Sequence, residues 1–180
     1  MIKWYARQSD VPTSWLHSLA QQAQVLAAKI EWHILANHLF ANGKALIFAG
    51  AFFKDTVSNK WLHQGIRILD REISEQFLPD GGHFELSPMY HAILLWDLCD
   101  LVNLASCSGI PVLIARTTEW QQIIQRGLVW LQTMCHPDGE IVNMAEVRLY
   151  INYLATLVIF VKFWQYEDVL EKLLVNRDNH

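Results

Sequence analysis

The stretch that decides the fold is residues 37–53, "NHLFANGKALIFAGAFF". Apolar side chains cover nearly its whole circumference, which is typical of a helix buried on all sides. The neighbouring segments must then supply the amphipathic helices that enclose it. Lys54 to Asn59 is polar and marks the exit of the chain from this central helix.

The segments on both sides of the central helix show apolar residues at helical spacing, and only brief stretches alternate as strands do. We expect the further helices over residues 12–36, 57–77, 88–109, 117–136 and 145–174. In the second of these, Trp61, Ile66 and Leu69 should face inward. The sequence therefore predicts an all-α fold.

A weak internal repeat indicates how these helices are arranged. Residues 64–82, "QGIRILDREISEQFLPDGG", and residues 126–140, "RGLVWLQTMCHPDGE", both lead from a glycine through an apolar helix into Pro-Asp-Gly. Repeated antiparallel helix hairpins favour a solenoid or an (α/α) toroid over a compact four-helix bundle. Helices that alternate in direction would bring both Pro-Asp-Gly turns and the start of the central helix to one rim.

Composition excludes several classes of function. The 180 residues suit one domain, and the net charge of -4 without a basic cluster excludes nucleic acid as a partner. The longest apolar run, residues 153–161, is too short for a membrane span. Three cysteines show neither zinc spacing nor a disulfide pattern, so we expect no cofactor and no metal. The N-terminus "MIKWYARQSD" lacks the apolar run of an export signal, so the chain as given would be cytoplasmic, and the sequence leaves its localisation open.

Two neighbouring residues at the start of the central helix could do chemistry. The Asn37 amide could stabilise a developing oxyanion, and the His38 imidazole could move protons near neutral pH. The alternative is that Asn37 caps the helix and His38 packs against it.

A second candidate group lies in residues 80–91, "DGGHFELSPMYH". The Tyr90 phenol could give a proton to a leaving oxygen, and His91, Glu85 and His83 could bind a substrate. The alternative for Tyr90 is a half-buried aromatic. His83 and Glu85 lack the paired histidines of a zinc site, which argues against a metal.

These stretches together resemble the helical toroid domain of the heparinase II/III-like and alginate-lyase-like polysaccharide lyases. The resemblance rests on residues 37–53, on "DGGHFELSPMYHAILLWDLCDLVNL" and on "HPDGEI", and it covers roughly residues 2 to 141. It implies an incomplete (α/α) toroid over residues 1–141, of about three helix pairs, followed in the same domain by a divergent helix over residues 142–180.

The resemblance implies β-elimination at the uronic-acid residues of an acidic polysaccharide. By the family pattern, Asn37 would neutralise the uronate carboxylate, Tyr90 would protonate the leaving oxygen, and His38 would be an alternative base. His91, Glu85 and His83 would lie around the substrate. Lyases of this kind are often periplasmic or secreted.

By this resemblance, we expect the chain as given to lack the earlier helix pairs of the toroid and the β-sandwich domain. The alternative function is therefore a truncated, catalytically inactive helical fragment that at most binds glycans or acts as a scaffold. An open arc of helices exposes apolar faces, so we also expect self-association or a partner polypeptide that covers them.

Overall fold

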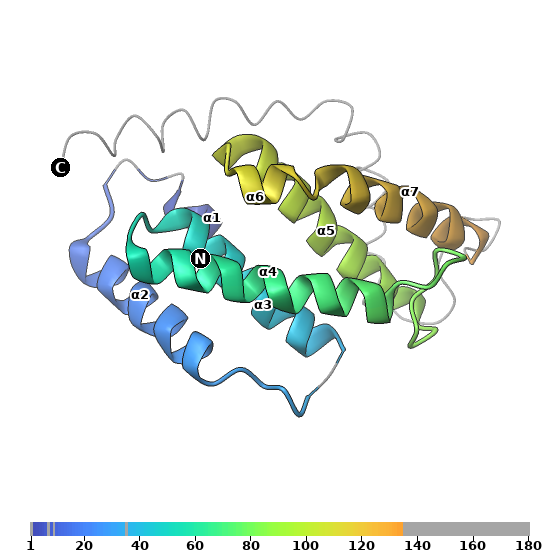
Figure 1. The fold of residues 1–180 in the computed structure, drawn as a ribbon, viewed down its shortest axis with the longest axis horizontal. Coiled ribbons are helices and arrows are strands. Elements are labelled where there is room, and N and C mark those ends of the chain that lie inside the picture. The colour runs from blue at the N-terminus through green and yellow to red at the C-terminus, as the bar shows by residue number, and fades with distance from the viewer. Residues whose placement is uncertain (1, 7, 9, 35, 135–180) are drawn as a thin grey trace. The chain divides into compact units, whose positions relative to one another are not determined.

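The computed structural model describes residues 2–6, 8, 10–34 and 36–134. Its helices are α1 (Ile2–Tyr5), α2 (Thr13–Ala28), α3 (Asn37–Phe52), α4 (Thr56–Gln76), α5 (Pro88–Ser108), α6 (Pro111–Ile114) and α7 (Thr117–Thr133) (Figure 1). Apart from one isolated bridge between Phe77 and His83, these described residues contain no β structure. The prediction of an all-α fold is confirmed.

The chain divides into two compact units. The first contains the described residues up to Glu72, and the second contains those from Ile73 onward. Helix α4 runs through this boundary, so most of it belongs to the first unit and its last turn to the second.

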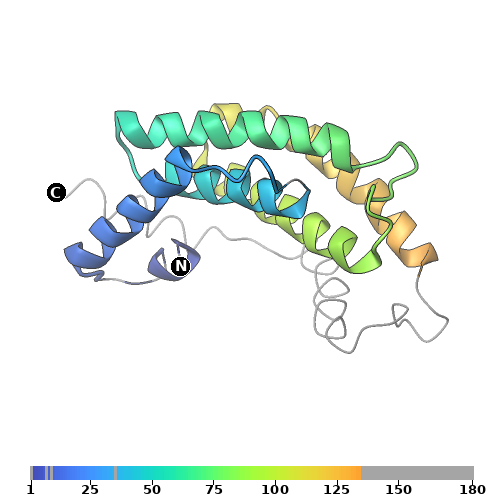
Figure 2. The same cartoon turned by 90° about the horizontal axis from the view of Figure 1, so that it is seen from below.

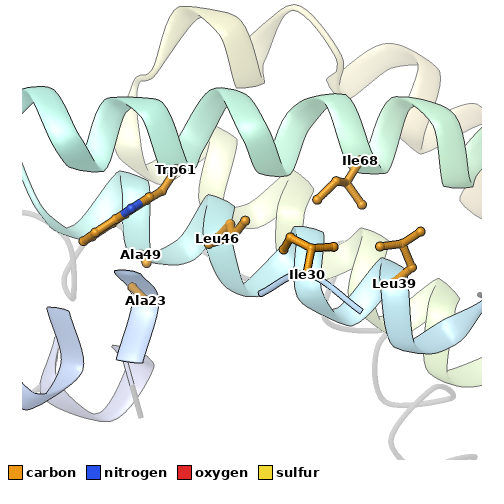
Figure 3. Packing of buried hydrophobic residues seen from close by; sticks show 7 residues of the cluster. All are labelled: Ala23, Ile30, Leu39, Leu46, Ala49, Trp61 and Ile68. Carbon is orange, nitrogen blue, oxygen red and sulfur yellow. The ribbon is translucent and has the colours of Figure 1, made fainter. Parts of the chain in front are cut away.

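Helix α3 is the buried element of the first unit, as predicted from its sequence. Leu39, Leu46 and Ala49 on α3 pack with Trp61 and Ile68 on α4, as Figure 3 shows. Ala23 of α2 and Ile30, which follows α2, complete the cluster. Leu69 and Ile66 are also buried, which confirms the inward face that was predicted for α4.

Glycines allow α3 and α4 to approach at the level of their backbones. A Cβ atom added to Gly65 would lie 2.5 Å from the Gly43 carbonyl oxygen, and one added to Gly50 would lie 2.6 Å from the Leu62 nitrogen. No side chain fits at these separations, so the close contact requires glycine. The three glycines fix the distance between the two helices.

One helix end differs clearly from its prediction. Helix α2 ends at Ala28 instead of continuing to Ala36, and Ile30 reaches the core from a non-helical segment. The predicted apolar face does not continue beyond Ile30, because Ile34 is exposed. Helix α4 begins at Thr56, within one residue of its prediction, and the Asp55 carboxylate accepts the Val57 and Ser58 amide protons at 2.7 Å.

The second unit is built from α5, α6, α7 and the connection that enters α5. Helix α5 begins at Pro88 and ends at Gly109, whose φ of 65° forms a left-handed cap. Helices α5 and α7 pack on each other through Leu95, Ala92 and Leu131. The expected helix over residues 145–174 and the second Pro-Asp-Gly turn lie outside the described residues.

Candidate functional site

The first candidate group lies where α3 begins. Asn37 is the first residue of α3 and is half-buried, while His38 is exposed. Neither side chain forms a hydrogen bond with another described residue. The N-cap position belongs to Ala36, so Asn37 does not cap the helix.

The residue before Asn37 has a strained backbone. Ala36 adopts φ 66° and ψ −136°, a region that L-residues with a Cβ rarely occupy. Such strain costs about 1–3 kcal/mol and collects at functional sites. Here it sets the direction in which the chain enters α3 at Asn37.

The second candidate group lies in the connection over residues 77–87, which joins α4 to α5. Its first half is a short hairpin in which the Leu78 amide donates to the Gly82 carbonyl at 2.9 Å and the Phe84 amide donates to the Gln76 carbonyl at 3.0 Å. The Asp80 carboxylate accepts the Gly82 amide proton at 2.9 Å. Asp80 is therefore a turn former, as residues of this type usually are.

The connection packs against α7, as Figure 2 shows at the end of that helix. A Cβ atom on Gly81, which has φ 93°, would lie 2.5 Å from the Arg126 carbonyl oxygen. One on Gly82 would lie 2.8 Å from the Trp130 indole nitrogen. The double glycine lets the hairpin lie directly on the α7 backbone and hold the entry to α5 in place.

His83 is fully buried inside this hairpin. Its Nε2 donates to the Gln76 side-chain oxygen at 3.0 Å, and its Nδ1 accepts the Glu85 amide proton at 3.4 Å. These partners assign a neutral ring with the proton on Nε2. Burial, and to a smaller extent the charge of His91, lowers the pKa of His83 from 6.5 to about 4.

The residues after His83 lead the chain out to solvent. Glu85 is exposed, and its carboxylate has no partner among the described residues. Leu86 has φ 54° and a side chain that is 70% exposed, an unusual conformation for a branched apolar residue. Both predicted groups thus follow a residue with positive φ, Ala36 before Asn37 and Leu86 before the start of α5.

Tyr90 is the third residue of α5 and is partly exposed. Its hydroxyl forms no hydrogen bond with the described residues. The Ser87 carbonyl accepts the His91 amide proton at 2.9 Å, which fixes the first turn of α5 around Tyr90.

His91 points away from solvent into the contact between α5 and α7. It is fully buried, and its Nε2 donates to the Gly127 carbonyl at 2.8 Å. Its ring lies 4.8 Å from that of Trp130, and its Nδ1 has no hydrogen-bond partner in the described structure. Burial lowers the pKa of His91, while the Gly127 carbonyl and the Asp80 carboxylate oppose that shift.

The second unit therefore brings together four of the predicted residues in one short region, His83, Glu85, Tyr90 and His91. Asn37 and His38 belong to the first unit. Tyr90 and Glu85 are accessible, whereas His83 and His91 are buried. The burial of the two histidines argues against the direct contact with a substrate that was predicted for them.

The partners that hold the two histidines could not be predicted from the sequence. Gln76 is the last residue of α4 and is 1% exposed. The Phe77 ring centre lies 6.2 Å from that of His83 and 6.2 Å from that of His91. The burial of a glutamine at a helix end could have been noticed only once the fold of the connection was known.

Residues 2–134, where described, contain no group of three or more side chains suited to hold a metal ion. None of the helices in that part of the chain is long and apolar enough to cross a membrane. Cys99 and Cys107 form no disulfide within the described residues, and Cys135 lies outside them.

A family of known proteins matches most of the chain. The family described as Heparinase II/III N-terminus matches residues 6–161, most of the chain. The chain belongs to the heparinase II/III family. The match extends beyond residue 141, where the sequence analysis placed the end of the resemblance.

Three relatives of the heparinase II/III chain are heparin-sulfate lyases. The protein of Bacteroides stercoris is 34% identical over 103 residues, which are 57% of this chain and 15% of the relative. That of Pedobacter heparinus is 38% identical over 77 residues, 42% of this chain and 11% of the relative. That of Bacteroides thetaiotaomicron is 26% identical over 115 residues, 61% of this chain and 16% of the relative.

The chain thus spans less than a fifth of the length of each of these relatives. No solved structure matches it significantly.

Proposed function

We propose that this chain contributes catalytic residues to a polysaccharide lyase that cleaves uronic-acid polymers by β-elimination. The observation that carries the proposal is Tyr90, a partly exposed phenol with no partner among the described residues. It lies at the start of α5 in a chain whose relatives are heparin-sulfate lyases. An incomplete (α/α) toroid is the arrangement we propose for the helices.

The proposed reaction assigns each accessible residue one task. A base removes the proton on the carbon next to the uronate carboxylate, and the electron pair forms a carbon–carbon double bond as the glycosidic oxygen leaves. Tyr90 protonates that oxygen, and His38 is the candidate base. The Asn37 amide donates hydrogen bonds to the carboxylate and stabilises the negative charge that develops there.

The remaining predicted residues support this chemistry from nearby. The exposed Glu85 carboxylate lies five residues before Tyr90, where it could contact a hydroxyl of the sugar chain. His91 ties the first turn of α5 to α7 through the Gly127 carbonyl, so it holds Tyr90 in place from the adjacent position.

A lyase assay on a panel of uronate polymers tests the proposal, because elimination creates an unsaturated sugar end that absorbs ultraviolet light. Tyr90→Phe removes only the hydroxyl and should lower the rate by about a hundredfold or more. Tyr5→Phe, the same change in α1, is the matched control and should leave the rate unchanged.

A folded chain that yields no product with any polymer would contradict the proposal. It would favour the alternative of an inactive helical fragment, and glycan binding without turnover would then separate a binding role from a scaffold.

Self-association remains a prediction for the same chain. Exposed apolar side chains such as Val25 and Val129, 56% and 65% exposed, are candidates for a covered surface. Light scattering that finds a monomer at micromolar concentration would contradict it.

A further inference from the structure

The structure assigns His83 a positioning role: its Nδ1 accepts the Glu85 amide proton and thereby holds the chain that leads into the Tyr90 helix. This inference rests on the proposed function of Tyr90, although the position of the chain can be measured without activity. His83 itself does not touch the substrate, because the side chain is fully buried.

Two hydrogen-bond partners, one an acceptor and the other a donor, fix the orientation of the His83 ring. The Gln76 side-chain oxygen can only accept, and the Glu85 amide can only donate, at 3.0 and 3.4 Å. The other neutral tautomer would place an N–H against the Glu85 amide and a bare nitrogen against the Gln76 oxygen, and would leave both groups unsatisfied. The neutral tautomer therefore ties the end of α4 to the residue that opens the exposed part of the connection.

The connection from His83 to Tyr90 is short and has few other restraints. The Leu86 amide donates to the His83 carbonyl at 2.9 Å, and the next backbone hydrogen bond is the one that begins α5, from the His91 amide to the Ser87 carbonyl. Leu86 itself has a strained backbone. A residue with an unfavourable backbone persists only where its surroundings determine it, and His83 is the buried side chain that contacts this segment.

Two nearly isosteric substitutions of His83 test the hydrogen bonds of the two ring nitrogens separately. In His83→Asn the amide oxygen takes the place of Nδ1 and can still accept the Glu85 amide proton, whereas the bond to Gln76 is lost. In His83→Gln the amide nitrogen takes the place of Nε2 and can still donate to Gln76, whereas the acceptor for Glu85 is lost. Thermal unfolding of both variants establishes that they are folded.

Hydrogen exchange of the Glu85 amide is the direct measurement. Losing one hydrogen bond of ordinary strength should raise its exchange rate about fivefold in His83→Gln, and His83→Asn should stay near the wild-type rate. The Phe84 amide, which donates to the Gln76 carbonyl, is the internal control and should keep its protection in both.

The same pair of variants reports on Tyr90. In a chain labelled on tyrosine, the ring signal that Tyr90→Phe removes should shift in His83→Gln and stay in place in His83→Asn. On a uronate polymer that the wild type cleaves, His83→Gln should lower kcat about fivefold and leave KM within about twofold.

Equal exchange of the Glu85 amide in wild type and folded His83→Gln would overturn the inference, and so would an equal loss of kcat in both variants. A wild-type chain without activity, combined with the expected changes in Glu85 exchange and in the Tyr90 signal, would leave the positioning role intact and refute the proposed function. If His83→Asn fails to fold, His83→Gln compared with wild type decides alone.

Discussion

The buried imidazole of His83 should make this protein lose stability as the solution becomes acidic. The unfolded chain binds a proton on His83 near pH 6.5, whereas in the folded chain the pKa is about 4. Between these two values the unfolded state holds more protons than the folded state, so the free energy of unfolding falls as the pH falls. The contribution of His83 to the free energy of unfolding is fully present above about pH 6.5 and is lost as the pH falls to about 4.

The size of the effect follows from the two pKa values. The difference between them corresponds to a loss of about 3 kcal/mol in the free energy of unfolding over the whole pH range, and of about 2 kcal/mol between about pH 7 and about pH 5. Because the side chain is fully buried, solvent does not screen this penalty. A charge on His91 would increase this penalty.

Urea unfolding followed by tryptophan fluorescence measures this contribution in the wild type and in His83→Asn, which cannot titrate. Every other group that titrates is common to both chains, so their difference isolates His83. The wild type should lose about 2 kcal/mol more than the variant between about pH 7 and about pH 5. Parallel stability profiles for the two chains would refute the reasoning.

Two further predictions concern the backbone of the first unit. Gly65→Ala should lower the free energy of unfolding by about 1–3 kcal/mol, because its Cβ would lie 2.5 Å from the Gly43 carbonyl oxygen. Gly43→Ala, whose closest contact would be 3.0 Å to a flexible Ile68 methyl, should cost less, and the opposite order in urea unfolding would contradict the packing described. Ala36→Gly should stabilise the chain by about 0.5–1 kcal/mol by relieving the positive φ of Ala36, and thermal unfolding that shows no gain would argue against strain there.

Local sequence determined where most helices lie. The all-round apolar character of residues 37–53 predicted α3, and Pro88 and Gly109 marked the ends of α5 as observed. These signals depend on the residues themselves, on proline at a first helical position and glycine at a left-handed cap, so no tertiary contact is needed to interpret them.

The spacing of apolar residues led to wrong predictions where tertiary contacts determine which residues are helical and buried. Ile30 continues the apolar face of α2, yet the helix ends at Ala28 and Ile30 is buried from a non-helical segment. Trp15 on the same predicted face is 47% exposed. A periodic pattern reports which residues are apolar, but the partner surface decides which of them are buried.

The sequence by itself determined that Asn37, His38, Glu85 and Tyr90 occur at the starts of helices or beside them, and the heparinase II/III match shows the family of the chain. Only the tertiary structure separated the accessible residues from the buried ones. His91 is held by the carbonyl of Gly127, 36 positions away, and His83 by a glutamine side chain at the end of α4. Histidine serves equally well as a ligand-binding or a buried hydrogen-bonded residue, and the choice depends on which backbone carbonyls and side chains the fold places around the ring.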